Sequence, residues 1–389
     1  MNSGAGEYVR VLVQKFGGTS LADLERLRHV ASLIKAARAE GYSVVVVVSA
    51  MGSYTDQLIS QAEPLSSALT SREMACYLVT GEMQSAALLA MALAQCDIAA
   101  YSCSAAQIDL RASGRYDHAQ LVSVDTNRIQ AILNKGIVPV ICGFQALNQE
   151  DEWVTLGRSG SDTTAVFIAS KLYAERCDIY KDVCGVMSAD PKKIEGVKQI
   201  YQMPLLAMLE FAKRGAEVLH LNSIEKAIES RVNLTVKSSF ENAVGTVFTT
   251  GVPQDICYYG VVHEQGFSQL ITDEKYEKMA GIHIHQDLNG IYHYTGKHAD
   301  ILWLSDMYLK THIASISQLD KITIVGTNLS RATEALSWIN KSPLKIHGVQ
   351  INDFSLSFYV DHTQGERMFK EVHTCVIDGF FVRDYSTVL

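Results

Sequence analysis

Residues 42–49 read Tyr-Ser-Val-Val-Val-Val-Val-Ser, with five valines in succession. A strand made only of β-branched apolar residues is typically buried on both faces, as in a parallel sheet that helices cover. The flanking segments fit such a sheet. Apolar residues recur at helical spacing over residues 21–40, and valines alternate as in a strand over residues 8–14.

The alternation of strands and helices continues to about residue 250. Apolar spacing predicts further helices over residues 71–95, 125–135, 161–175, 204–214 and 223–231. It predicts strands over 137–143, 177–181 and 233–238, and a hairpin over 144–155. Strands separated by helices favour an α/β fold, in which a mainly parallel sheet lies between two layers of helices.

The pattern changes after a predicted linker at residues 251–253, Gly-Val-Pro. Shorter strands follow, and residues 321–373 read as strand, helix, strand, strand, helix. The segment 260–318 reads as a weaker first copy of this unit. We therefore expect a first domain over residues 1–250 and a second, α+β region over 255–389, with units at about 255–318 and 319–389.

Composition limits the classes of function. The chain has 389 residues and a net charge of −8, so nothing draws it as a whole to nucleic acid or to an anionic membrane. Its most apolar stretch, residues 83–94, is shorter than the roughly 20 residues that span a bilayer. The first residues show no secretory signal pattern. We expect a cytoplasmic protein that binds neither membrane nor nucleic acid.

The cysteines and histidines predict no metal site. The eight cysteines include no CxxC pair, and most lie among apolar residues, as reduced thiols do in the cytosol. The twelve histidines show no zinc-binding spacing, and His283 and His285 alternate as neighbours on a strand do.

The motif Lys15-Phe16-Gly17-Gly18-Thr19-Ser20 falls between the first predicted strand and the first helix. Paired glycines let a ligand approach the backbone, and amides at the start of a helix bind anions. The lysine adds a positive charge. This arrangement predicts a phosphate-binding loop, and the alternative is an ordinary glycine-rich turn with a surface lysine.

A second motif, residues 157–165, reads Gly-Arg-Ser-Gly-Ser-Asp-Thr-Thr-Ala and leads into a helix. Ser161 or Asp162 can cap that helix, which is the structural alternative to a functional role. Arg158 has no capping role, and its guanidinium suits bidentate binding of a carboxylate.

Two further motifs carry acidic residues. Glu82, in Thr80-Gly81-Glu82, lies within an otherwise apolar helix, where a charged side chain is rarely left unpaired. A salt bridge within the fold is the structural alternative. Residues 181–191 place an acid and a turn after a buried strand, at the edge where open α/β sheets bind their ligands.

Taken together and in order, these motifs resemble the aspartate kinase family of the amino acid kinase superfamily. The matching segments cover the first 250 residues: KFGGTS at 15–20, VSAMG at 48–52 with Thr55-Asp56, TGE at 80–82, GRSGSDTTA at 157–165, KDVCGVMSADP at 181–191, GAEVLH at 215–220 and VKSSF at 236–240. The resemblance implies the amino acid kinase fold followed by ACT-like, ferredoxin-like regulatory domains.

The resemblance implies that Mg-ATP phosphorylates the β-carboxylate of L-aspartate, giving 4-phospho-L-aspartate for the synthesis of amino acids such as lysine. A carboxylate with a pKa near ~3.9 is already ionised at neutral pH, so it needs no general base. Charge neutralisation and in-line positioning would carry catalysis.

The family's site residues map onto this chain by motif. Those implied to hold the transferring phosphoryl group are Lys15 and the amides of Gly17 and Gly18, together with Mg²⁺, and Phe16 joins them in the set implied to bind the ATP cofactor. Those implied to line the aspartate pocket are Ser49, Thr55, Glu82, Arg158, Ser161 and Asp162, with Arg158 on the α-carboxylate and Glu82 on the ammonium group; Lys15, Arg158 and Asp162 form the catalytic set. Those implied to lie along the nucleotide are Lys181, Asp182, Met187, Lys192 and Glu217. ACT-like domains further imply a homodimer, and such domains commonly bind an amino acid; whether lysine, threonine or no effector binds to this chain is left open by the sequence, and so is a loss of feedback control.

Some residues depart from the family pattern. Ser159 replaces a glycine, Lys181 a threonine and Glu217 a lysine, while Met187 and Lys192 replace a tyrosine and an arginine. The family's lysine at position 217 faces the ATP phosphates. Either Lys181 supplies the missing positive charge, with Glu217 paired to it, or the use of ATP is impaired.

Other functions fit the same motifs. One alternative is a degraded kinase fold that binds an amino acid and regulates a partner. Another is a related kinase that acts on glutamate, N-acetylglutamate or UMP.

Overall fold

The computed structural model describes residues 10–379, except 69–70, 242, 274, 277–278, 287–290 and 309–314. The chain divides into two compact units. The first unit comprises Met1–Val186, Tyr201–Leu205 and Glu217–Thr250. The second comprises Met187–Ile200, Leu206–Ala216 and Gly251–Leu389, so two segments that precede residue 250 group with the C-terminal part.

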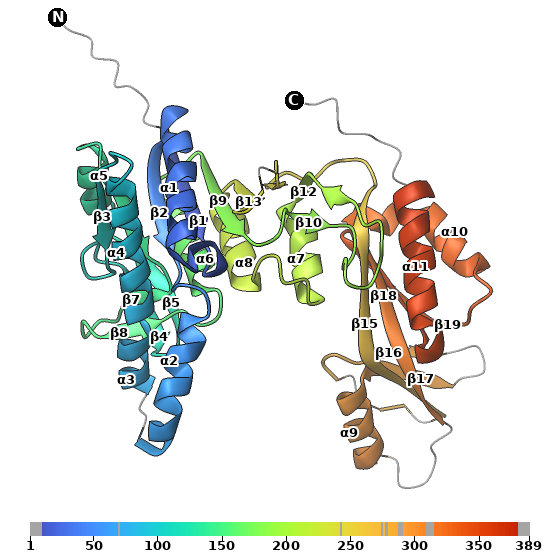
Figure 1. Cartoon of the computed structure of the whole chain (residues 1–389). Helices are drawn as coiled ribbons and strands as arrows, with labels where there is room; N and C mark the ends of the chain where they lie inside the picture. The colour runs from blue at the N-terminus through green and yellow to red at the C-terminus, as the bar shows by residue number, and fades with distance from the viewer. Residues whose placement is uncertain are drawn as a thin grey trace, which may run out of the picture. The chain divides into compact units, whose positions relative to one another are not determined.

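The first unit is built on an eight-stranded sheet in the order β12-β14-β13-β9-β1-β2-β6-β3 (Figure 1). Its strands are β1 (Val11–Phe16), β2 (Ser43–Val48), β3 (Ala100–Cys103), β6 (Val138–Cys142), β9 (Arg176–Lys181), β12 (Gln202–Pro204), β13 (Leu234–Ser238) and β14 (Thr246–Thr249). Every pair is parallel except β13 with β14. The predicted, mainly parallel sheet is therefore confirmed.

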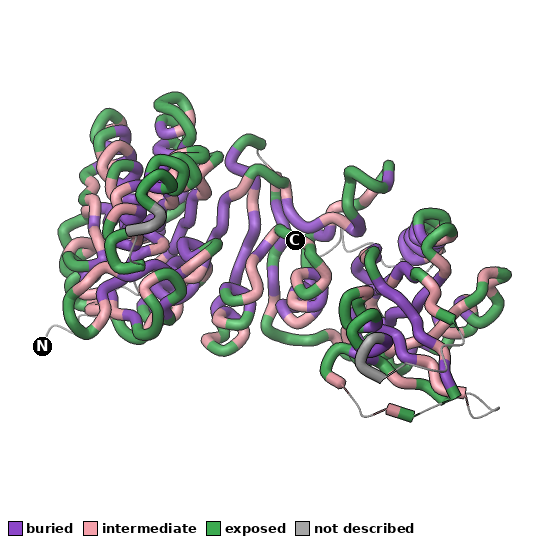
Figure 2. The backbone as a smooth tube through the Cα atoms, turned by 90° about the horizontal axis from the view of Figure 1, so that it is seen from below, coloured by how far each residue is buried: buried purple, intermediate pink, exposed green. Residues whose placement is uncertain are grey.

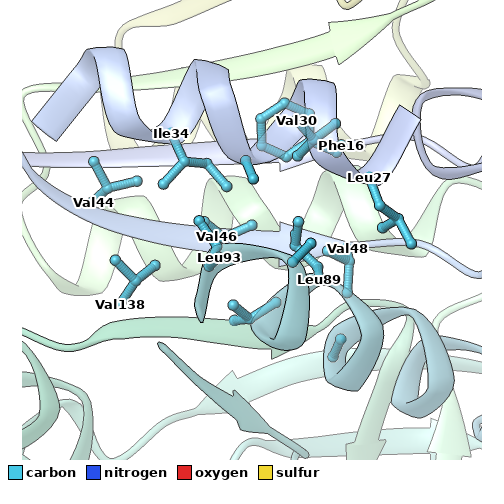
Figure 3. Packing of buried hydrophobic residues seen from close by; sticks show 14 of the residues in the cluster. Phe16, Leu27, Val30, Ile34, Val44, Val46, Val48, Leu89, Leu93 and Val138 are labelled. Carbon is cyan, nitrogen blue, oxygen red and sulfur yellow. The ribbon is translucent and has the colours of Figure 1, made fainter. Parts of the chain in front are cut away.

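Helices cover both faces of this sheet, with α1 (Leu24–Ala39) and α4 (Thr80–Ala94) on one face and α6 (Gly160–Lys171) on the other. The unit also contains α2 (Tyr54–Ala62), α3 (Ser71–Leu78), α5 (Thr126–Leu133) and α8 (Leu221–Ser230). The core on one face joins α1 and α4 to alternate residues of the central strands, including Phe16, Val44, Val46 and Val48 (Figure 3). Lys15 points to the other face, where it contacts α6.

The helix predicted over 71–95 is divided at Val79 into α3 and α4. By length and composition the stretch Ser71–Ala94 is apolar enough to cross a membrane, although 44% of its most apolar window is buried inside the fold. In α4 the buried residues include Ala86, Leu89 and Leu93, which pack against the sheet. We therefore interpret α4 as a core helix.

A small second sheet accompanies the large one. Its order is β5-β4-β7-β8, with β4 (Arg111–Arg115), β5 (His118–Ser123), β7 (Gln145–Leu147) and β8 (Trp153–Thr155). The predicted hairpin over 144–155 is confirmed as the antiparallel pair β7 and β8. The hairpin of β4 and β5 was not predicted, because its polar residues 111–123 show no clear apolar alternation.

The second unit contains a six-stranded antiparallel sheet, β16-β17-β15-β18-β20-β19. The strands are β15 (Cys257–Thr272), β16 (His283–Gln286), β17 (Tyr292–Lys297), β18 (Ser315–Thr327), β19 (Ile346–Ile351) and β20 (Ser355–Asp361). Its helices are α7 (Leu205–Lys213), α9 (His298–Tyr308), α10 (Thr333–Lys341) and α11 (Gly365–Thr374), and a short pair, β10 (Val186–Met187) and β11 (Gln199–Ile200), lies at its start. Many buried positions lie on the strands of both units (Figure 2), whereas β16 and β19 contain no buried residue.

The predicted unit at 321–373 is confirmed as the second half of β18 followed by α10, β19, β20 and α11. The segment predicted as a weaker first copy, residues 260–318, contains the second half of β15 followed by β16, β17, α9 and the first half of β18, so the order of its described elements differs from that of the unit at 321–373. The long strands β15 and β18 run through both copies, so the copies share one sheet. The first copy is hard to recognise because only α9 gives it a helical signal among the described residues.

Candidate active site

The turn after β1 is shaped by its glycines. The Gly17 amide donates to the Tyr180 carbonyl over 3.3 Å, and the Gly52 amide donates to the Gly18 carbonyl over 2.8 Å. A Cβ atom on Gly18 would lie 2.6 Å from the Gly52 carbonyl oxygen, closer than real Cβ atoms approach. Only glycine at position 18 allows residues 49–52 to pack against this turn.

Asp162 brings two lysines together at the carboxyl end of the sheet. Lys15 Nζ lies 2.5 Å from Asp162 Oδ1, and Lys181 Nζ lies 3.2 Å from Asp162 Oδ2. Lys15 ends β1 and Lys181 ends β9, which are neighbouring parallel strands, while Asp162 begins α6. The topology therefore joins three residues that are up to 166 positions apart in sequence.

The two lysines favour the ionised form of the Asp162 carboxyl. Burial alone would raise the pKa of the Asp162 carboxyl, but Lys15 and Lys181 together lower that pKa to about 2. Burial lowers the pKa of the Lys15 ammonium group, and the charge of Asp162 opposes this effect. Two ammonium groups on one carboxylate leave a net positive charge, which suits a phosphate group.

Glu82 lies in the first turn of α4 with only 3% of its surface exposed. Its Oε1 atom accepts a hydrogen bond from the Ala50 amide over 3.0 Å, and its Oε2 atom is buried without a hydrogen-bond partner. Burial raises the pKa of this carboxyl to about 8. Within the described residues no basic side chain forms an ion pair with Glu82, so a salt bridge does not explain it. An unpartnered buried carboxylate oxygen is suited to a ligand cation.

The other residues predicted on the substrate side lie around these groups. The Ser49 amide donates to the Phe16 carbonyl, and the Ser49 carbonyl accepts from Ser85 Oγ. Thr55 lies in the first turn of α2 and is partly exposed. Ser161 is buried against Gly143, where a Cβ atom would lie 2.6 Å from Ser161 Cβ.

Arg158 is exposed in the loop before α6. In the described part of the chain it forms no ion pair with an acidic side chain, so its guanidinium remains open to a ligand carboxylate. Sequence reasoning did not single out His118, which closely approaches Gly157: a Cβ atom on Gly157 would lie 2.5 Å from His118 Nδ1. Nothing in the sequence links the hairpin that carries His118 to this loop.

Ser159 adopts the left-handed conformation, with φ 56° and ψ 22°. A residue with a Cβ atom pays roughly 1 kcal/mol in that region, and glycine does not. This backbone conformation explains why the aspartate kinase family usually has glycine at this position. Ser159 therefore strains the backbone locally and leaves the chemistry of the loop unchanged.

We expect Ser159→Gly to raise the free energy of unfolding by about 0.5–1 kcal/mol, because relief of the left-handed strain outweighs the added freedom of the unfolded chain. Urea denaturation of the whole chain measures this. Ser53→Gly is the matched control, since Ser53 also precedes a helix without a side-chain capping bond but has φ −97°. If Ser53→Gly raised the free energy of unfolding as much as Ser159→Gly does, the strain argument would be contradicted.

The residues predicted along the nucleotide have different environments. Phe16 is completely buried and stacks on Tyr180 with ring centroids 4.6 Å apart, so its side chain belongs to the core and is not available to a ligand. Asp182 is exposed directly after β9. Met187 and Lys192 belong to the second unit, where Met187 ends β10 and the Lys192 amide donates to Asp190 Oδ1.

The structure corrects the suggestion that Glu217 pairs with Lys181. Lys181 contacts Asp162, whereas Glu217 is exposed in a turn before α8 and forms no ion pair within the described residues. Sequence reasoning assigned no role to Ser239, whose amide donates to the Lys181 carbonyl over 2.9 Å and whose hydroxyl lies 2.7 Å from Ser20 Oγ. The motif at 236–240 was the available signal for it.

The mainly parallel sheet, the glycine turn and the lysine–aspartate cluster describe an α/β protein with positive charge at the carboxyl end of its sheet. Residues 10–238 match the model of the amino acid kinase family, and the chain belongs to that family. Among curated proteins it is similar to the aspartokinase of Geobacillus stearothermophilus, 40% identical over 270 residues that cover 68% of this chain and 66% of that protein. It is also similar to aspartokinase 2 of Bacillus subtilis, 38% identical over 67% of this chain and 64% of that protein.

The chain thus matches slightly less than two thirds of the length of these relatives. Solved structures share its fold over nearly its whole length. Escherichia coli aspartokinase III, crystallised with aspartate and ADP, has a TM-score of 0.71 at 19% identity. The match covers 95% of this chain and 100% of the E. coli chain. Aspartate kinase from Clostridium acetobutylicum has a TM-score of 0.74 at 18% identity. That match covers 94% of this chain and 100% of the C. acetobutylicum chain.

Proposed function

We propose that this chain is an aspartate kinase, which transfers the γ-phosphoryl group of Mg-ATP to the β-carboxylate of L-aspartate. The observation that carries the proposal is the pair of ammonium groups held by Asp162, close to the glycine turn. The unpartnered oxygen of Glu82 adds a site for a substrate ammonium group. The similarity to aspartokinases over 68% of the chain supports the same activity.

In the proposed reaction a β-carboxylate oxygen attacks the γ-phosphorus atom. The bond from phosphorus to the bridging oxygen breaks, and ADP leaves with the electron pair. Lys15 and Lys181 would neutralise the phosphate oxygens, so the two anions can approach each other. Mg²⁺ enters as part of the substrate Mg-ATP, and the described residues contain no cluster of three ligating side chains that would hold it independently.

On the substrate side, Arg158 would bind the α-carboxylate and Glu82 the α-ammonium group. Ser49, Thr55 and Ser161 would complete the pocket. Three-point binding of a free α-amino acid distinguishes this pocket from one for UMP or an N-acylated amino acid, because neither offers an ammonium group to Glu82.

An acceptor panel tests the proposed activity. The full chain is incubated with Mg-ATP and hydroxylamine, which traps an acyl phosphate as a hydroxamate, and ADP release is measured in parallel. We expect both products with L-aspartate, and neither with glutamate, N-acetylglutamate or UMP. Aspartate binding without ADP release would instead favour the regulatory, non-catalytic alternative.

We expect Glu82→Gln to raise the KM for L-aspartate by about tenfold to a hundredfold and to leave the KM for ATP nearly unchanged, because it removes the charge that faces the ammonium group. With a carboxyl pKa of about 8 in the free protein, the wild-type KM for aspartate should fall as the pH rises toward 8. The variant should lose that dependence. An unchanged aspartate KM would remove Glu82 from the substrate site.

The raised pKa of the Glu82 carboxyl also makes the stability of the fold depend on pH. Its pKa in the folded chain lies above the ordinary value of 4.5, so the folded state binds the proton more tightly. The resulting stability is complete below pH 4.5 and is lost as the pH rises toward 8. Glu82→Gln should therefore flatten the fall in the free energy of unfolding across this range.

We further propose that Lys181 replaces the positive charge missing at position 217. Lys181→Met should lower kcat/KM for ATP by about tenfold to a hundredfold, because one charged phosphate contact is lost. Adding Glu217→Lys to that variant should recover part of the loss. Lys171→Met is the control, since Lys171 is exposed at the end of α6. Unchanged ATP kinetics in Lys181→Met would show that Lys181 has no role at the phosphates.

The second unit supports further proposals by resemblance. Its shared β/α sheet is consistent with ACT-like regulatory domains, and a related E. coli structure was solved with lysine and aspartate. We propose that the chain forms a homodimer through this unit, works in the cytoplasm and supplies the aspartate-derived amino acid pathway. Light scattering of the purified chain tests the dimer directly.

A further inference from the structure

The segment that follows β13 is fixed by its own hydrogen bonds. β13 ends at Ser238, which is opposite the last residue of β9. The Ser238 hydroxyl oxygen accepts hydrogen bonds from the amides of Phe240 and Glu241, over 3.1 and 3.2 Å. The Arg26 guanidinium of α1 lies 4.1 Å from the centre of the Phe240 ring. Ser239 is therefore held between two anchored neighbours, beside the end of β9.

Ser239 joins two parts of the candidate active site. Its amide donates to the Lys181 carbonyl over 2.9 Å, and its hydroxyl oxygen lies 3.3 Å from the same carbonyl oxygen. The hydroxyl oxygen also lies 2.7 Å from Ser20 Oγ, in the glycine turn that follows β1. Ser20 and Ser239 are each only 2% exposed. One buried hydroxyl group thus links the glycine turn to the strand end that carries Lys181.

One arrangement of the two hydroxyl protons uses every oxygen atom in this link. The Lys181 carbonyl can only accept, so the Ser239 hydroxyl donates to it. The Ser20 hydroxyl then donates to Ser239 Oγ. Because buried hydroxyl groups in folded proteins nearly always have a partner, removing either hydroxyl leaves the other side of the link without its hydrogen bond.

The link acts where the ladder between β1 and β9 ends. The last register pair of these strands is Phe16 with Tyr180, and the Gly17 amide still reaches the Tyr180 carbonyl over 3.3 Å. Lys181 lies one residue beyond this ladder, and its carbonyl is bonded to Ser239 instead. The pair of hydroxyl groups is therefore the next connection between the glycine turn and β9.

The relative position of these two strand ends decides where their ammonium groups lie. Lys15 is on β1 and Lys181 ends β9, and both reach Asp162. A phosphate group that contacts both ammonium groups and the turn requires fixed distances among them, because a misplacement of about 1 Å can cost about a hundredfold in rate. A bond that fixes the turn against β9 sets these distances before a nucleotide binds.

We propose that Ser239 is a positioning residue for phosphoryl transfer. Its hydroxyl, together with that of Ser20, holds the glycine turn and Lys181 at the spacing that receives the phosphates of the nucleotide. Ser239 acts through these groups and not by contact with a substrate. This inference rests on the proposed function and extends its machinery to the segment after β13, which the sequence motifs left without a role.

Steady-state kinetics of Ser239→Ala with Mg-ATP and L-aspartate measure the effect. We expect kcat to fall about tenfold and the KM for L-aspartate to stay within about twofold, because the phosphate-binding groups shift while the pocket around Glu82 is intact. Ser20→Ala should also lower kcat. The double variant should be no slower than Ser239→Ala, because that single variant has already broken the bond between the two hydroxyl groups.

Ser357→Ala is the matched control. The Ser357 hydroxyl is likewise 2% exposed and lies 2.8 Å from another hydroxyl, Thr323 Oγ1, in the second unit. Each alanine variant should lose a similar free energy of unfolding in urea, because each loses a buried hydroxyl bond. Ser357→Ala should nevertheless keep kcat within about twofold of the wild type. A purely structural role for Ser239 would give the two variants the same kcat.

Calorimetry with a non-hydrolysable Mg-ATP analogue separates this inference from the proposed function. We expect Ser239→Ala to raise the Kd of the analogue about fivefold to tenfold. If the wild type binds the analogue but releases no ADP with L-aspartate, the proposed function fails, and the change in Kd still tests Ser239.

The inference is overturned if Ser239→Ala leaves both kcat and the Kd of the analogue unchanged. It is also overturned if Ser357→Ala lowers kcat as much, or if the losses of the two single variants multiply in the double variant. Should Ser239→Ala fail to fold, Ser20→Ala decides the question by the same measurements.

Discussion

Replacing Lys15 with methionine should lower kcat about a thousandfold with saturating ATP and aspartate. The ammonium group is buried and held 2.5 Å from Asp162, so it is already oriented before substrates bind. Removing a preorganised charge at a developing phosphoryl transition state typically costs about 10²–10³ in kcat. Methionine keeps the length and apolar volume of the side chain, so the fold should be retained. Steady-state kinetics of the purified variant provide the measurement.

Lys171→Met is the matched control, because it removes an equivalent charge from an exposed position of α6. It should leave kcat within about twofold of the wild type, as expected for a surface charge. If Lys15→Met retains activity within about tenfold of the wild type, the phosphate-binding interpretation of residues 15–20 is wrong.

Asp162→Asn should be the second large effect, on both activity and stability. Asp162 is 1% exposed and is the only carboxylate within ion-pair distance of Lys15 and Lys181 among the described residues. Asparagine leaves two buried ammonium groups without a counter-charge. Removing one partner of a buried pair costs about 3–5 kcal/mol, so we expect the free energy of unfolding to fall by about 3 kcal/mol. We expect kcat to fall at least about a hundredfold.

The pH dependence gives this prediction a separate check. Asp162 has a folded-state pKa of about 2, below its ordinary value of 3.8. Its contribution to stability is therefore present above pH 3.8 and is lost as the pH falls toward 2. The wild type should lose stability relative to Asp162→Asn in that window. If the free energies of unfolding of the two proteins changed equally between pH 3.8 and 2, the role given to Asp162 would be contradicted.

The sequence predicted the sheet of the first unit well, because its strands are continuous apolar runs and its helices have regular apolar spacing. The five valines of β2 are all buried, as a strand covered on both faces requires. Polar strands, short strands and strands that belong to two units at once were harder to predict. The hairpin of β4 and β5 has little apolar alternation, and β15 and β18 each serve two copies of a unit.

For the site, the sequence indicated the residue types but not their pairing. Lys15 and Asp162 were predicted from motifs, whereas the contact between Lys181 and Asp162 depends on strand order, which places β9 beside β1. The predicted pairing of Glu217 with Lys181 was wrong, because the strand order places Lys181 beside Asp162 instead. Phe16 lies in a ligand-binding motif, but strand alternation directs its side chain into the core.

The central claim is that Lys15 and Lys181, held by Asp162, neutralise the phosphates so that two anions can react. The most direct test is a crystal structure of the chain with L-aspartate and a non-hydrolysable Mg-ATP analogue. We expect both ammonium groups within hydrogen-bond distance of β- or γ-phosphate oxygens. A triphosphate bound elsewhere, or a Lys15 side chain turned to solvent, would contradict the account.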